Sequence, residues 1–354
     1  VEGCASAMWR EEHPEICSIL QKNQMLQEAR HASNLEPMQP LPNESTLGVY
    51  IVLTKDCNLR CRYCFAGTGT EFEAGYMSEK TANDAVEEII TRPGYQNYDI
   101  TFTGGEPMLN TSMMVRICKK IRAHCREYHK NSRFSIITNG TCLSDKTIDL
   151  LLENRVLSIQ ITVDGDRKIH NLRRPMKNGK GSYDTILNNL TLLISKLRKR
   201  KLILRVNVDK QNVFEIYSFI NDLEELHIKE NIKLSFAKTF KPLDFQYEYI
   251  DDDGNNDICL YDLYNYCFKK NFDIAVPRVE YCGYSNRSFI TIDWDGKIYP
   301  CPGIVSRSEF YLYDAAAVKT KDMAIRERKI RKMQHKNTNC DGCAYEALCK
   351  GGCV

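Results

Sequence analysis

Short β-prone runs and stretches with helical spacing of apolar residues alternate along the middle of the chain. A serine followed by an acidic residue opens two of the helical stretches, as is typical of helix starts. Repeated strand–helix units predict a parallel sheet with right-handed crossovers, and therefore an α/β fold. The predicted strands are Leu47–Leu53, Asp99–Phe102, Arg133–Thr138, Leu157–Val163, Leu202–Val208 and Lys233–Phe240. The predicted helices are Ser78–Ile90, Ser112–Tyr128, Ser144–Glu153, Tyr183–Leu197 and Val213–Leu226.

The segments that flank this repeating region have different patterns. The N-terminal segment predicts a helix near Glu15–Arg30, followed by a Pro-containing linker. Near the C-terminus, Phe289 to Tyr299 alternates around Asp295-Gly296, which predicts a β-hairpin. A length of 354 residues suits one large domain with an appendage, or two domains. We therefore divide the chain into residues 1–46, 47–240 and 241–354.

Composition and charge are those of an ordinary globular protein, with 43% hydrophobic and 27% charged residues. A net charge of +3 is too small to indicate nucleic-acid binding. No run approaches the ~20 apolar residues that a membrane helix requires, and the N-terminus lacks the pattern of a signal peptide. The 16 cysteines cluster at metal-ligand spacings, which favours a reducing, cytoplasmic environment over a disulfide scaffold.

Three cysteines directly after the first predicted strand carry the clearest chemical signal. Cys57, Cys61 and Cys64 stand in the run Thr-Lys-Asp-Cys-Asn-Leu-Arg-Cys-Arg-Tyr-Cys-Phe. Four cysteines would close a four-iron cluster for electron transfer, whereas three leave one iron without a protein ligand. The alternative, a zinc site, usually takes four Cys or His ligands, and no fourth lies beside this run.

This run resembles the signature of the radical S-adenosylmethionine (SAM) superfamily. The resemblance implies that SAM chelates the open iron and that an electron from the cluster cleaves it to a 5′-deoxyadenosyl radical. A second motif supports it: the run Thr103 to Pro107 reads Thr-Gly-Gly-Glu-Pro and follows a predicted strand. Glycines let the backbone approach a ligand closely, and a carboxylate can accept a hydrogen bond from an ammonium group. The superfamily fold is a partial (β/α)6 TIM-like barrel, which would cover residues 47–240.

Further contacts with SAM are implied at the ends of the predicted strands, although each of these motifs alone is an ordinary turn. His170, Arg173 and Arg174 are expected in a loop that either binds an anionic substrate group or is simply a solvated basic loop. The implied SAM-contacting residues are Tyr63, Phe65, Thr103, Gly104, Gly105, Glu106, Pro107, Thr138, Asn139, Thr162, Asp164 and Asn207.

A second group of cysteines lies in the C-terminal third and resembles the SPASM extension of this superfamily. The extension implies two auxiliary 4Fe-4S clusters and, in most members, a peptide or protein substrate. By resemblance, Cys282, Cys301 and Cys353 serve the first auxiliary cluster, and Cys340, Cys343 and Cys349 serve the second. The alternative is a structural zinc knuckle formed by Cys340 to Cys353.

Six of the seven usual SPASM cysteines are present before the sequence ends at Val354. Either the natural protein continues, which we favour, or a non-cysteine ligand completes the second cluster. The first cluster has three evident ligands, so an open iron there could bind a substrate thiolate and lower its pKa. Cys259 or Cys267 could close that site instead, although both are expected to be buried structural thiols.

The resemblance therefore implies a radical SAM enzyme that forms a cysteine thioether crosslink in a ribosomally made precursor peptide. It also implies a flavodoxin- or ferredoxin-type electron donor. One alternative is an anaerobic sulfatase-maturating enzyme, but that family places an aspartate where this chain has Pro302, directly after Cys301. Carbon–carbon or carbon–oxygen crosslinking remains open. A non-catalytic iron–sulfur electron carrier is disfavoured because it would need no SAM pocket.

Overall fold

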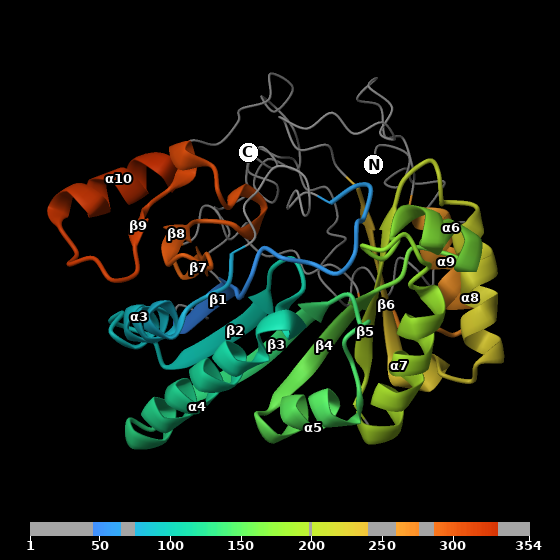
Figure 1. The fold of residues 1–354 in the computed structure, drawn as a ribbon, viewed down its shortest axis with the longest axis horizontal. Helices are drawn as coiled ribbons and strands as arrows, with labels where there is room; N and C mark the ends of the chain where they lie inside the picture. Colours follow the sequence, from blue (N-terminus) through green and yellow to red (C-terminus); the bar gives the residue numbers. More distant parts are fainter. Residues whose placement is uncertain (1–44, 65–74, 198–199, 240–259, 276–286, 332–354) are drawn as a thin grey trace, which may run out of the picture.

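The computed structural model describes residues 45–64, 75–197, 200–239, 260–275 and 287–331. Six parallel strands form the centre of the molecule, and each lies within two residues of its predicted position (Figure 1). On one face of each strand the side chains are buried, and on the other they are partly exposed. The strands are β1 (Thr46–Val52), β2 (Asn97–Thr103), β3 (Asn131–Thr138), β4 (Val156–Thr162), β5 (Leu202–Val208) and β6 (Ile232–Lys238).

Helices cover the buried face, where apolar side chains of strands and helices form one core. Ser78 and Ser144 cap two of them by accepting hydrogen bonds from Thr81 N and Thr147 N, so both predicted helix starts are confirmed. The helices are α3 (Glu79–Ile90), α4 (Thr111–Glu127), α5 (Asp145–Glu153), α7 (Tyr183–Leu197) and α8 (Glu215–Glu225). The predicted α/β fold with an open, partial barrel is therefore confirmed.

The predicted C-terminal hairpin is present, but it does not stand apart from the barrel. Its first strand, β7 (Phe289–Ile292), pairs in parallel with β1, and β8 (Lys297–Tyr299) turns back antiparallel to it. A short strand, β9 (Tyr313–Asp314), follows, so that the sheet has the order β6-β5-β4-β3-β2-β1-β7-β8-β9 (Figure 1). The hairpin thus continues the parallel sheet next to β1, and helix α10 (Lys321–Arg331) comes after it.

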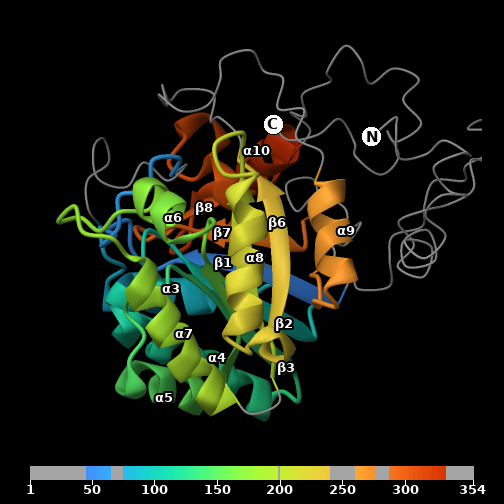
Figure 2. The same cartoon turned by 90° about the vertical axis from the view of Figure 1, so that its right-hand side faces the viewer.

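At the opposite end of the sheet, α9 (Tyr261–Lys269) lies near β6, which α8 covers (Figure 2). Leu234 of β6 forms a parallel bridge with Ile274, so the segment after α9 covers part of that edge. Helix α6 (Arg167–Arg173), which follows β4, was not expected, and its short length explains why apolar spacing did not reveal it. Within the described residues, no helix is long and apolar enough to cross a lipid bilayer. The helix expected near Glu15–Arg30 lies outside the described residues.

Candidate functional site

The loop that carries the three N-terminal cysteines leaves the carboxyl end of β1 and is fixed to its neighbours by backbone hydrogen bonds. Gly105 N and Glu106 N donate to Thr54 O and Asp56 O, at 2.8 and 2.9 Å. On the far side, Arg60 N and Arg62 N donate to carbonyl oxygens of the segment that ends α6. The loop is thereby held across the carboxyl edge of the parallel strands, where catalytic residues of such folds gather.

Cys57 is buried, and Cys61 and Cys64 are partly buried. Burial raises the pKa of the Cys57 and Cys61 thiols to about 12 each, so neither ionises readily unless a metal charge compensates. Cys57 Sγ accepts hydrogen bonds from Leu59 N at 3.4 Å and from Asn139 Nδ2 at 3.8 Å. Among the described side chains, no three His, Cys, Asp or Glu groups converge closely enough for a single metal ion. Three free cysteines on one loop suit a four-iron cluster, whose thiolates attach to different irons.

Gly104 and Gly105 are needed for close packing against the cysteine loop. A Cβ on Gly104 would lie 2.2 Å from Thr54 O, and one on Gly105 would lie 2.2 Å from Asp56 O. Gly104 also has a φ of +148°, a conformation that glycine adopts at little cost. The space of each missing side chain is thus occupied by the protein's own backbone, and contact of these glycines with SAM stays a prediction.

Glu106 is fully buried and links the ends of β2 and β3. Its Oε1 accepts from Thr138 Oγ1 at 2.7 Å and from Met108 N at 3.0 Å, while Oε2 accepts from Asn139 N at 2.7 Å. Burial raises the pKa of Glu106, and these donors partly offset the rise by stabilising the carboxylate. The predicted residues Glu106, Thr138 and Asn139 are thus brought together, with Glu106 as their common partner.

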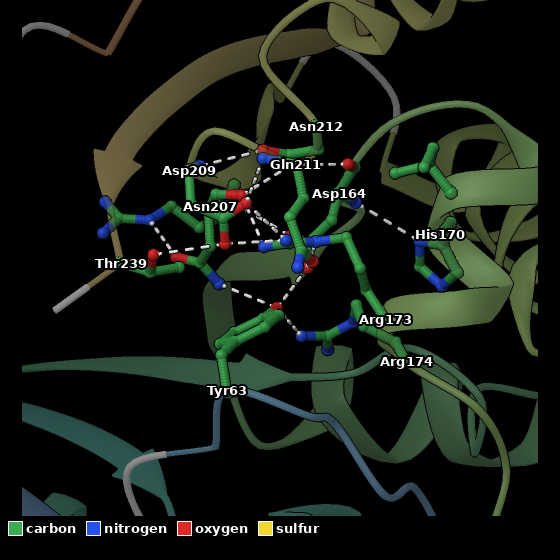
Figure 3. Close-up of polar contacts among 12 residues, drawn as sticks. Tyr63, Asp164, His170, Arg173, Arg174, Asn207, Asp209, Gln211, Asn212 and Thr239 are labelled. Carbon is green, nitrogen blue, oxygen red and sulfur yellow. Dashed lines mark hydrogen bonds and ion pairs between the residues drawn. The ribbon is translucent and has the colours of Figure 1, made fainter. Parts of the chain in front are cut away.

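Tyr63 joins three strand ends through one hydroxyl group (Figure 3). Arg174 Nη1 donates to this oxygen at 2.6 Å and Asn207 Nδ2 donates at 3.1 Å, while the hydroxyl itself donates to Asp164 Oδ2. Tyr63 lies on the cysteine loop after β1, Asp164 lies in the turn after β4, and Asn207 lies in β5. Three residues implied by the resemblance therefore form one network directly beside the cluster cysteines.

Buried ion pairs of Arg173 with Asp164 and Asp209 hold this network in place. Arg173 Nη1 lies 2.7 Å from both oxygens of Asp209, and Arg173 Nε lies 3.6 Å from Asp164 Oδ2. The Arg173 guanidinium also stacks on the Tyr63 ring, 4.8 Å from its centroid. Asn212 Nδ2 donates to Asp164 O at 2.7 Å, which fixes the turn after β4. Asp209 and Asn212 were not found from the sequence, because no motif marks them.

The expectation that His170, Arg173 and Arg174 form an exposed basic loop is wrong. His170 and Arg173 lie on α6, Arg174 caps it, and their exposed fractions are 0%, 2% and 7%. A solvated loop is therefore excluded. Arg174 Nε is buried and has no hydrogen-bond partner among the described residues, which leaves one donor of this guanidinium available beside the cluster loop.

The remaining expected site residues are distributed as follows. Thr103 ends β2, Pro107 begins the short 3-10 helix η3 (Pro107–Asn110), and Thr162 ends β4 with 7% exposure. Cys301 follows β8 and is half-buried. Cys267 is fully buried in α9, as expected of a structural thiol. Outside the described residues lie Phe65, Cys259, Cys282, Cys340, Cys343, Cys349 and Cys353.

Comparison with known proteins agrees with this geometry. Residues 51–223 match the model of the radical SAM superfamily. The chain carries a radical SAM domain. It is accordingly a radical SAM enzyme, whose cofactors are SAM and a 4Fe-4S cluster. The residues present fit both groups, since one loop supplies three free cysteines and Arg174 has an unpaired buried donor next to this loop.

Two curated proteins that are similar to this chain differ in name, identity and coverage. A cysteine-type anaerobic sulfatase-maturating enzyme of Clostridium novyi is 23% identical over 338 residues, 85% of each chain. The sporulation killing factor maturation protein SkfB of Bacillus subtilis is 30% identical over 155 residues, 42% of this chain and 35% of that protein.

Two solved structures have the same fold over most of the chain. The anSMEcpe structure with bound AdoMet has a TM-score of 0.69 at 21% identity, and covers 87% of this chain and 89% of that one. SuiB of Streptococcus suis, bound to S-adenosylmethionine, has a TM-score of 0.61 at 18% identity, and covers 98% of this chain and 84% of that one.

Proposed function

We propose that this radical SAM enzyme modifies a ribosomally made precursor peptide and forms a cysteine thioether crosslink. The observation that carries the proposal is the continuous sheet from the SAM pocket to Cys301. Strand β7 pairs with β1, and Cys301 follows β8, the next strand of the same sheet. The hairpin therefore attaches a proposed cluster cysteine to the sheet that also carries the cysteine loop. Similar folds have been solved with peptides, including anSMEcpe with the Kp18Cys peptide and SuiB with the precursor peptide SuiA.

The residues of the SAM pocket have distinct roles in this proposal. Cys57, Cys61 and Cys64 hold the cluster, which when bound with SAM supplies the radical that removes a substrate hydrogen atom. Glu106 fixes the turn after β3, so that the donors of that turn are oriented before SAM arrives. Arg174 offers its unpaired Nε to the SAM carboxylate. A flavodoxin- or ferredoxin-type protein supplies the electron.

We further propose that the C-terminal cysteines hold two auxiliary clusters. Cys282, Cys301 and Cys353 serve the first, and Cys340, Cys343 and Cys349 contribute to the second. With three protein thiolates, the first cluster keeps a position for the substrate cysteine, whose pKa it lowers and whose sulfur it places near the reacting carbon.

Formylglycine formation is the second candidate, because the sulfatase-maturating relatives match along most of both chains. That reaction needs a base beside the substrate cysteine. Pro302 takes the position of the expected aspartate and begins the 3-10 helix η5 (Pro302–Ile304). Asp293 is 1% exposed and forms an ion pair with Lys55, so its carboxylate is not free to act as this base. Both features favour thioether formation.

The test uses anaerobically reconstituted enzyme, reductant, SAM and a cysteine-containing peptide encoded by the short reading frame beside the gene. A thioether removes two hydrogens from the peptide and protects its sulfur from alkylation. Formylglycine replaces the sulfur with oxygen and creates an aldehyde that a hydrazide captures. Formation of 5′-deoxyadenosine with an unchanged peptide contradicts both functions.

Iron and sulfide analysis tests the auxiliary clusters separately. Cys301→Ala should lower the iron content, whereas Cys118→Ala, which removes a buried thiol of α4, should not. Equal iron content in both variants, with zinc present, would remove the auxiliary clusters from the proposal.

A further inference from the structure

Arg205 projects from the inner face of β5, which is the face that carries Asn207. On this strand Leu202, Leu204, Val206 and Val208 are buried against the helices, and the alternate residues face inward. By register Arg205 lies beside Thr162 of β4 and Ser235 of β6. Since Asn207 reaches Tyr63 in the cysteine loop, Arg205 lies one step deeper in the barrel, below the SAM pocket.

The guanidinium of Arg205 is held by neutral groups. Its Nε donates to Asn207 Oδ1 at 3.2 Å, and its Nη1 donates to Ser235 Oγ at 3.3 Å. Within the described part of the chain, no carboxylate lies within ion-pair distance of it. Its interior neighbour Arg173 differs, because that guanidinium pairs with Asp164 and Asp209.

Burial makes this arrangement costly. It lowers the pKa of Arg205, and the partial compensation comes first from Tyr264 and then from Asp164, Tyr63 and Tyr50. Tyr264 of α9 contributes most to this compensation, and Tyr50 of β1 lies within electrostatic range across the barrel. A partly desolvated cation with neutral hydrogen-bond partners gains strongly from a carboxylate that enters its site.

We propose that Arg205 binds a carboxylate of the peptide substrate, either an acidic side chain near the modified residue or the C-terminal carboxylate. This inference rests on the proposed function, since it assumes a peptide in the barrel. Arg205 fixes the register of the peptide below the SAM pocket, with Asn207 and Ser235 keeping its guanidinium oriented.

The first experiment compares synthetic peptides that differ only in one carboxylate. Each fluorescein-labelled peptide contains one cysteine in an Ala/Ser background, with Glu or Gln at successive positions around it, and with a free or amidated C-terminus. Fluorescence anisotropy measures the affinity of the reconstituted, SAM-loaded enzyme for each. We expect one carboxylate position to bind about tenfold more tightly than its neutral counterpart, as a charge-assisted hydrogen bond provides. The Glu series and the free-terminus series distinguish the two sources.

The second experiment changes the protein. Arg205→Gln should abolish the tenfold preference and Arg205→Lys should keep part of it. Arg133→Gln serves as the matched control, because Arg133 is an exposed arginine on β3 that already pairs with Asp99. The wild-type comparison of Glu with Gln peptides remains decisive even if an Arg205 variant fails to fold.

Absence of any carboxylate preference in the wild type, including absence of binding, overturns the inference. So does a preference that persists in Arg205→Gln. Weaker SAM binding by that variant, with the peptide preference intact, would assign Arg205 to the nucleotide instead. Peptides that bind with the expected preference but remain unmodified would contradict the proposed reaction while supporting the carboxylate subsite.

Discussion

The Asp293 carboxylate lies 3.3 Å from the Lys55 ammonium group, although the two residues belong to opposite ends of the sequence. Lys55 precedes Cys57 by two residues, and Asp293 directly follows β7. The next hairpin residue, Trp294, covers Gly75, where a Cβ would come within 2.3 Å of the indole. Gly75 in turn accepts a hydrogen bond from Lys55 N at 2.9 Å. The C-terminal hairpin therefore fixes the start of the cysteine loop.

Asp293→Asn should weaken this attachment. The substitution removes the negative charge from the buried ion pair with Lys55, which we expect to cost about 1–3 kcal/mol in the free energy of unfolding. The variant should also retain less iron at the N-terminal cluster after gel filtration. Thermal unfolding and iron analysis measure the two effects.

The matched control is Asp84→Asn, which breaks an exposed ion pair with Lys80 on α3. Such pairs contribute little, so its stability and iron content should stay close to those of the wild type. If both variants behave alike, the Asp293–Lys55 pair does not position the cysteine loop.

Glu106→Gln should affect both stability and SAM binding. An amide cannot accept at both of its ends, so either the Thr138 hydroxyl or Asn139 N would face an NH2 group. We expect a loss of about 1–3 kcal/mol in the free energy of unfolding, because a buried donor loses its acceptor. SAM affinity, measured by equilibrium dialysis, should fall as the turn after β3 loosens. Glu153→Gln, at the exposed end of α5, is the control and should change neither.

The strands and most helices were predictable because their signals are local. Apolar runs bounded by turn residues mark β1 to β6, and the serine caps mark the starts of α3 and α5. The partner of β7 was not predictable. Asp295-Gly296 specifies a hairpin through local turn geometry, but nothing within it specifies parallel pairing with a strand 241 residues earlier, where Ile51 meets Ile292.

The candidate site was predicted as a set of residues but not as a set of contacts. Tyr63, Asp164 and Asn207 were all implied, yet the hydrogen bond between Tyr63 and Asn207 spans 144 positions and no short motif encodes it. The same limit applies to Arg174. Its sequence neighbours indicate a basic loop, and only the packing of α6 against the cysteine loop shows that its guanidinium is buried.

Asn139→Asp should lower the reduction potential of the N-terminal cluster. Hydrogen bonds to cluster sulfurs are among the factors that set this potential. Asn139 Nδ2 approaches Cys57 Sγ at 3.8 Å, while Oδ1 accepts from Thr141 N at 2.9 Å. The isosteric acid keeps the acceptor but replaces the donor with negative charge beside the thiolate. Potentiometric titration followed by EPR measures the shift.

The control for this prediction is Asn131→Asp, at an exposed position at the start of β3, the strand that Asn139 follows. It adds the same charge far from the thiols and should leave the potential unchanged. An Asn139→Asp potential equal to or above that of the wild type would show that this amide does not influence the cluster.

His170 should make stability depend on pH. Its Nδ1 accepts from Asp164 N at 3.3 Å, and Ser182 Oγ gives its only proton to Arg174 O, so His170 Nε2 donates to Ser182 at 3.0 Å. Both nitrogens are therefore used by the neutral imidazole. Burial, with Arg174 and Arg173 adding to it, lowers the pKa of His170 well below 6.5.

As the pH falls below about 6.5, the His170 imidazole therefore becomes protonated in the unfolded chain but stays neutral in the folded chain. The stabilising contribution is complete above that pH and decreases toward the folded pKa, by up to about 1.4 kcal/mol per pH unit. Urea unfolding of the reconstituted enzyme at pH 7.5, 6.5 and 5.5 measures this slope. His170→Gln should flatten it, whereas His227→Asn, at an exposed left-handed position with a φ of 54°, should not. A slope unchanged by His170→Gln would mean that other groups cause the acid sensitivity, and that the Asp164 turn does not depend on a neutral imidazole.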